Sequence, residues 1–119
     1  MATVEKGIVL LDFWAAWCGP CRAFAPVFEA ASERHPAVTF GKIDTEAQPA
    51  IAQAFDIKAI PTIAIMRDGV VLGVQAGMVP AAGLDQIIAK VQELDMAEVH
   101  RAIAADEAKA AGGNEPEPA

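Results

Sequence analysis

Long apolar runs and clusters of positive charge are absent from this sequence. No run in its 119 residues approaches the roughly 20 apolar residues of a membrane-spanning helix. Residues 1–6 lack the basic and then apolar pattern of a secretory signal, so we expect a cytoplasmic protein. The sequence contains nine Lys and Arg residues and 16 Asp and Glu residues, so its formal net charge is −7. Without a basic patch, neither nucleic acid nor an anionic membrane is an expected partner.

The sequence also has no internal repeat and no glycine-rich phosphate loop. We therefore expect no nucleotide, flavin or other cofactor bound to this chain. Its hydrophobic content of 54% is ample for one core, and its length fits one small domain.

Cysteine is equally scarce, and the only two cysteines stand three positions apart. They lie in the stretch Trp17-Cys18-Gly19-Pro20-Cys21, at a predicted junction between a strand and a helix. Two thiols at this spacing can close a small disulfide loop, and a helix that begins at Cys18 directs its free N–H groups at that sulfur, favouring thiolate. We predict Cys18 as the nucleophile. Cys21, one turn deeper, is the predicted resolving thiol, which attacks the mixed disulfide formed with a client.

Other uses of the pair remain open at this point. Half of a zinc site would need two further ligands, and His35 and His100 are far from each other in the sequence. A purely structural disulfide is also possible, but so short a loop stabilises little through chain entropy. A reducing compartment suits reactive thiols better than a structural bridge, so redox chemistry is the favoured interpretation.

Asp12 is the one ionisable residue in an otherwise apolar run. Residues 7–14 read Gly-Ile-Val-Leu-Leu-Asp-Phe-Trp, which is typical of a strand buried on both faces. Burial would raise the pKa of the Asp12 carboxyl, which suits a group that takes a proton from Cys21 and returns it later. The alternative is a surface carboxyl on an edge strand, against which the apolar neighbours of Asp12 argue.

Several of these motifs resemble those of the thioredoxin family. Residues 11–22, with the sequence LDFWAAWCGPCR, match the family's active-site segment, including the Gly-Pro pair between the cysteines. The chain is also similar to the family at a strand end (42–44), a loop around a cis proline (59–62), a hairpin turn (67–69) and a glycine near the substrate groove (76–77). The resemblance covers about residues 7–95.

The resemblance implies a protein-disulfide reductase that acts on exposed disulfides of client proteins. A flavin-containing, NADPH-dependent thioredoxin reductase would restore its dithiol, and the protein would be a monomer. A cis Ile60-Pro61 bond would present the Ile60 backbone to an extended client, whereas the alternative is a trans proline that begins a strand. Trp17 is expected to be half exposed at the contact surface, with ordinary core as its alternative. The rim that receives clients and reductase would comprise Trp17, Gly19, Pro20, Ile60, Pro61, Ala76 and Gly77.

Hydrophobic periodicity predicts an α/β sheet of mixed direction, which the resemblance identifies as a thioredoxin fold of about four strands flanked by helices. We expect strands near residues 8–14, 38–43, 62–67 and 70–75, and helices near 19–34, 48–54 and 80–95. The last of these helices has an apolar stripe, expected to pack on the sheet, that consists of Leu84, Ile87, Ile88, Val91 and Leu94.

Both ends depart from the family pattern. Thioredoxins carry a strand and a helix before the segment that matches Gly7, and here only six residues precede it, so we expect both elements to be missing. We assign residues 1–95 to the thioredoxin-like domain, 96–111 to an additional helix and 112–119 to a disordered tail. The extra helix has a thin apolar stripe and either covers sheet surface left bare by the short start or stays solvated. A third departure is Phe40, which stands where many bacterial thioredoxins have a lysine near the buried aspartate.

Two rival functions stay open beside disulfide reduction. An oxidase or isomerase of the same fold would have a less stable disulfide, usually signalled by histidine between the cysteines, whereas Gly19-Pro20 argues for a reductant. A chaperone-like binding module would use the C-terminal helix as its interface, and the dithiol would then be secondary.

Overall fold

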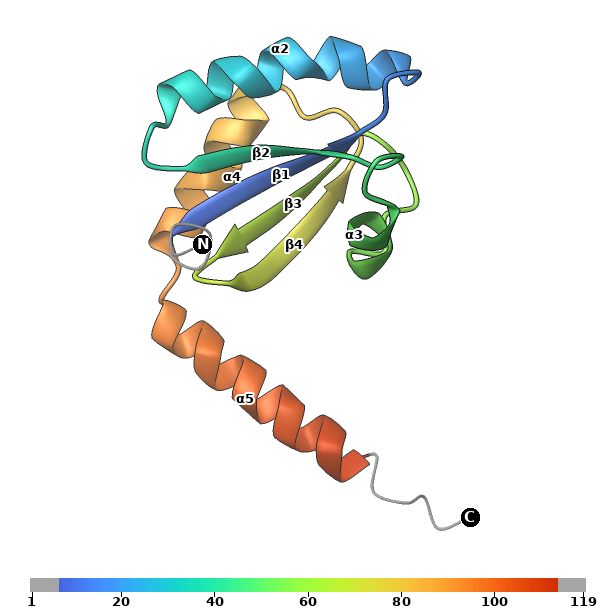
Figure 1. Cartoon of the computed structure of the whole chain (residues 1–119). Coiled ribbons are helices and arrows are strands. Elements are labelled where there is room, and N and C mark those ends of the chain that lie inside the picture. Colours follow the sequence, from blue (N-terminus) through green and yellow to red (C-terminus); the bar gives the residue numbers. More distant parts are fainter. Residues whose placement is uncertain (1–6, 114–119) are drawn as a thin grey trace.

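The computed structural model of the protein describes residues 7–113 and places four strands in one mixed sheet (Figure 1). The strands are β1 (Ile8–Trp14), β2 (Thr39–Asp44), β3 (Thr62–Arg67) and β4 (Val70–Ala76), in the spatial order β2-β1-β3-β4. β1 and β2 are parallel, whereas β1 with β3 and β3 with β4 are antiparallel. The predicted fold class and all four strands are confirmed, with β2 one residue later than expected.

The helices among the described residues are α2 (Gly19–Arg34), α3 (Pro49–Ala54), α4 (Ala81–Glu93) and α5 (Met96–Gly113). Helices α2 and α4 lie on one face of the sheet, where their apolar side chains build the core with β1 and β3 (Figure 1). The stripe predicted on α4 is buried at Leu84, Ile88 and Val91. The expectation for Leu94 is wrong, because this residue lies beyond the helix end and is 39% exposed. None of the described helices is long and apolar enough to cross a membrane.

Strand β1 holds the centre of the sheet because its side chains are apolar on both faces. Leu10 belongs to the core formed with α2 and α4. Phe13 points to the opposite face and packs against Phe55, just after α3, with ring centroids 5.3 Å apart. β1 ends at Trp14, and the chain turns through residues 15–17 into α2. The two cysteines therefore lie at the carboxyl end of β1, where the chain enters α2.

Helix α5 extends away from the sheet (Figure 1). None of its side chains from Met96 to Lys109 is buried, so the hypothesis that it covers bare sheet surface is wrong and the solvated alternative holds. The helix runs two residues past its predicted end, so Gly112 and Gly113 are helical and do not belong to a tail. The other predictions for the ends, a tail over 114–119 and missing elements before Gly7, lie outside the described residues. The division into domains stays a prediction.

Deleting residues 97–119 is expected to leave the melting temperature within about 2 °C of the full-length value, because none of the described side chains of α5 is buried. Differential scanning calorimetry of both proteins measures this. A matched control is Ile88→Ala, which removes a fully buried side chain from α4 and costs about 2–5 kcal/mol. A deletion that lowered the melting temperature as much as this control would show that α5 does cover the core.

Candidate functional site

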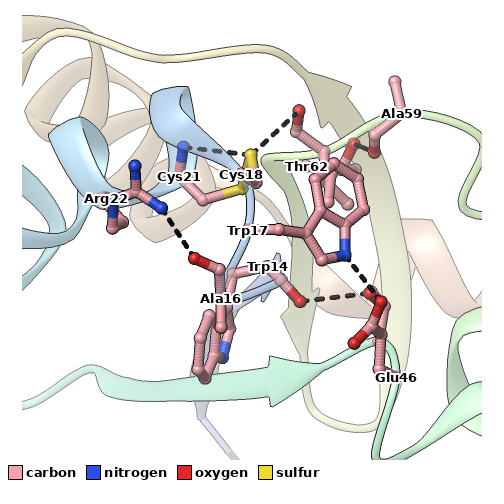
Figure 2. The surroundings of a disulfide bond; sticks show 11 residues. Trp14, Ala16, Trp17, Cys18, Cys21, Arg22, Glu46, Ala59 and Thr62 are labelled. Carbon is pink, nitrogen blue, oxygen red and sulfur yellow. Dashed lines mark hydrogen bonds between the residues drawn. A yellow bond between two sulfur atoms is a disulfide. The ribbon is translucent and has the colours of Figure 1, made fainter.

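The two cysteines form a disulfide at the start of α2 (Figure 2). Cys18 is the N-cap of the helix, with an extended backbone, and its N–H donates to the carbonyl of Ala15 at 3.1 Å. The Cα atoms of Cys18 and Cys21 lie 5.2 Å apart, a normal span for a disulfide. The predicted junction between strand and helix, and the ability of the pair to bond, are therefore confirmed.

The local backbone favours negative charge on Cys18. The N–H of Cys21 donates to the Sγ of Cys18 at 3.2 Å, so one of the free N–H groups of the first helical turn already points at this sulfur. Both cysteines are nearly buried, with exposed fractions of 4% for Cys18 and 2% for Cys21. The two cysteines do not differ in exposure. They differ in their position on the helix, because only Cys18 lies at the N-terminus, where the helix dipole and the unpaired N–H groups favour a thiolate.

Asp12 lies in the middle of β1 and has no exposed surface. Because β1 is flanked by β2 and β3, the alternative of an exposed carboxyl on an edge strand is wrong. Neither carboxylate oxygen has a hydrogen-bond partner among the described residues. Alternation along β1 puts Asp12 on the same face as Leu10, beneath α2, the helix that carries Cys21 in its first turn.

Burial raises the pKa of Asp12 from 3.8 to about 6, while the positive charge of Lys42 opposes this rise. Lys42 is the register partner of Asp12 on β2, so the two residues are neighbours in the sheet, and the Lys42 ammonium lies 5.3 Å from the ring centre of Trp14. Phe40, which replaces the usual lysine of the family, packs instead against Phe28 of α2 with ring centroids 5.1 Å apart. The positive charge that acts on Asp12 therefore comes from Lys42 and not from position 40, which the local sequence around Asp12 does not reveal.

Replacing Asp12 with asparagine should change how stability depends on pH. Since folding raises this pKa from 3.8 to about 6, the native state disfavours the ionised carboxylate by about 3 kcal/mol. That cost is nearly absent at about pH 3, grows as the pH rises to about 6, and is nearly complete above about pH 7. We expect the free energy of unfolding of Asp12→Asn, relative to wild type, to increase by about 3 kcal/mol between about pH 3 and pH 8. Urea denaturation at both pH values measures it, and a constant difference would contradict the assignment.

The loop before β3 lies against the disulfide. The Ile60-Pro61 peptide bond is cis, as the resemblance implies, so the trans alternative is wrong. The carbonyl oxygen of Ile60 lies 3.8 Å from the Sγ of Cys18. The N–H of Gly77 donates to the carbonyl of Pro61 at 2.8 Å, and the φ of Gly77 is +91°, a conformation that favours glycine. The structure therefore brings Ile60, Pro61 and Gly77 to the dithiol, with Ala76 exposed at the end of β4.

Trp17, Gly19 and Pro20 are exposed beside the cysteines. Trp17 has an exposed fraction of 66%, so the alternative that it is ordinary core is wrong. Its indole N–H donates to the Oε2 of Glu46 at 2.6 Å (Figure 2). Sequence reasoning missed Glu46, because it follows β2 and no motif connects it to a tryptophan 29 positions earlier.

A zinc site receives no support from the side chains around the cysteines. No group of three or more His, Cys, Asp or Glu residues able to hold a metal occurs within residues 7–113. His35 lies at the other end of α2, where its Nε2 is 2.7 Å from the Oδ1 of Asp85 on α4. The other histidine, His100, is exposed on α5.

Comparisons with known proteins agree with one another. The family model described as Thioredoxin matches residues 1–90. The chain is 52% identical over 106 residues to a protein of Streptomyces coelicolor named putative thioredoxin 2, which covers 89% of this chain and 79% of that protein. It is 43% identical over 87 residues to the thioredoxin of Listeria monocytogenes, covering 72% of this chain and 84% of that one. A solved structure of Fasciola hepatica thioredoxin superposes with a TM-score of 0.68 and 33% identity, over 73% of this chain and 84% of the other.

Proposed function

This chain belongs to the thioredoxin family and is a thiol-disulfide oxidoreductase, and from this premise we propose that Cys18, Cys21 and Asp12 carry its reaction. The observation that supports these roles most strongly is the position of Cys18 at the N-terminus of α2, where its sulfur accepts the N–H of Cys21. A helix N-terminus favours thiolate, and thiolate is the form that attacks disulfides.

The reaction begins with the reduced protein. The Cys18 thiolate attacks one sulfur of a client disulfide, so that a bond forms between Cys18 and the client while the client's own disulfide breaks. The second client sulfur leaves as a thiolate and takes a proton. Cys21 then loses its proton, attacks the Sγ of Cys18 and releases the first client sulfur as a second thiolate. The client is reduced by two electrons, and the protein is left with the Cys18–Cys21 disulfide that the structure contains.

Asp12 accepts the proton of Cys21 in this second step, directly or through one water molecule. A base works best when its pKa lies near the working pH, and the pKa of about 6 leaves Asp12 mostly ionised at neutral pH without making it a very weak base. Its burial beneath α2 and its two unpartnered oxygens support this role, since a buried acceptor without a partner is free to take a proton.

The client contacts a rim around the two sulfurs. An extended client segment pairs its backbone with Ile60, and this places its disulfide over Cys18. Pro61 has almost no exposed surface, so it acts by shaping the loop. The remaining rim is formed by the exposed or half-buried residues Trp17, Gly19, Pro20, Ala76 and Gly77. Backbone pairing makes few demands on client sequence, which suits a reductant with many clients.

Membership of the family implies disulfide-containing clients and a thioredoxin reductase as partners. In our proposal the reductase is flavin-containing and draws on NADPH, the protein acts as a monomer, and it works in the cytoplasm, where a reducing pool keeps the dithiol ready. No observation among the described residues favours an oxidase, an isomerase or a binding module built on α5 over this function.

Reduction of insulin disulfides, coupled to NADPH and a thioredoxin reductase, tests the proposal. We expect NADPH oxidation and insulin precipitation that both depend on the chain. If the chain accelerated neither, although both of its thiols were free and its fold was intact, the proposed function would be wrong.

A further inference from the structure

Trp17 and Glu46 form a pair at the rim that the disulfide exchange itself does not use. Trp17 directly precedes Cys18 and exposes 66% of its surface. The hydrogen bond from its indole N–H to the Oε2 of Glu46, at 2.6 Å, uses only one carboxylate oxygen (Figure 2). An exposed aromatic face and a carboxylate therefore stand together, one residue from the attacking sulfur.

The loop that carries Glu46 is held in place by its neighbours. Thr45 donates to the carbonyl of Trp14 twice, from its N–H at 2.9 Å and from its Oγ1 at 3.1 Å. The Oδ1 of Asp44 accepts the N–H groups of Glu46 at 2.9 Å and Ala47 at 3.3 Å. These bonds tie the loop after β2 to the end of β1. The carboxylate is thus presented beside the indole from a fixed backbone.

The charge of Glu46 is not neutralised by an ion pair within residues 7–113. Three cations of the neighbouring elements have contacts of their own. The Arg22 guanidinium donates to the carbonyl of Ala16 at 2.7 Å, the Lys42 ammonium lies 5.3 Å from the ring centre of Trp14, and Lys58 lies 3.7 Å from a carboxylate oxygen of Asp56. The pair of Trp17 and Glu46 therefore leaves an exposed negative charge at the edge of an exposed indole ring.

A flat cation fits this arrangement best. A guanidinium stacks on an indole face and at the same time donates to a carboxylate, whereas an ammonium is more strongly hydrated and lacks the planar geometry. We propose that Trp17 and Glu46 form a subsite for a basic side chain of the client, arginine in preference to lysine, close to the disulfide that Cys18 attacks. This inference rests on the proposed function, and it adds a charge preference to backbone pairing that is otherwise tolerant of sequence.

Two disulfide peptides test the subsite. The first peptide has an arginine on each side of its first cysteine. The second peptide is identical except that both arginines are replaced by citrulline, the neutral isostere of arginine. With the reduced full-length chain, we expect the arginine peptide to be reduced about fivefold faster than the citrulline peptide. In Glu46→Gln, which keeps an oxygen for the indole N–H but removes the charge, this ratio should fall to nearly one. The ratio in wild type should also fall as the ionic strength approaches about 1 M.

Glu98→Gln is the matched control, because it removes the same charge from exposed α5, and it should keep the wild-type ratio. A wild-type ratio of one, or a ratio unchanged in Glu46→Gln, would overturn the subsite while disulfide reduction itself stands. Failure of wild type to reduce either peptide would overturn the proposed function and the subsite with it.

Discussion

Cys18→Ser is expected to abolish disulfide reduction, with a rate at least about a thousandfold below that of wild type, as for loss of a catalytic nucleophile elsewhere. A serine hydroxyl in this position remains un-ionised at neutral pH, and it cannot form a mixed disulfide with the client. Precipitation of reduced insulin chains, followed by light scattering with dithiothreitol as the electron donor, measures the loss.

The substitution should leave the fold unchanged, because a serine oxygen can still accept the N–H of Cys21 at the start of α2. Far-ultraviolet circular dichroism of the variant serves as the control for folding. A well-folded variant that kept a tenth or more of the wild-type rate would show that another group attacks the client.

Cys21→Ser is expected to stop the reaction halfway. The first attack by Cys18 needs no second thiol, but without Cys21 the mixed disulfide has no internal nucleophile to resolve it. We expect one client molecule to be trapped covalently per protein chain and repeated turnover to fall by at least about a hundredfold. Intact-mass spectrometry, after mixing the variant with a small disulfide peptide, measures the adduct.

The double variant Cys18→Ser, Cys21→Ser provides the control and should form no adduct. If Cys21→Ser completed many turnovers, Cys21 would not be the resolving thiol. If instead the adduct formed on Cys21 in the complementary variant Cys18→Ser, the two roles would have to be exchanged.

Features set by neighbouring residues could be predicted from the sequence. The apolar run of β1, the helix that begins beyond Cys18 and the turn at Asp68-Gly69 depend on local preferences. Asp68 and Gly69 have φ values of +54° and +79°, the conformation that a tight hairpin turn requires and that this dipeptide favours. Asp12 could be assigned to a buried position because an ionisable residue within a strand that is apolar on both faces shares the burial of its neighbours.

Features that depend on residues far apart in the sequence could not be predicted. The effect of the Lys42 charge on Asp12 follows from the register between β1 and β2, which no local pattern reveals. The bond between Trp17 and Glu46 depends on how the loop after β2 meets the loop before α2. The sequence does not decide the place of α5, because its thin apolar stripe fits both a packed and a solvated helix.

In the proposed mechanism Cys18, and not Cys21, is the attacking thiol. Limited alkylation of the reduced full-length protein with iodoacetamide at neutral pH, followed by peptide mass spectrometry, tests it most directly. Since only Cys18 lies at the N-terminus of α2, we predict that roughly nine-tenths or more of the label is on Cys18. Equal labelling of the two cysteines, or a majority on Cys21, would show that Cys18 is not the more reactive thiol.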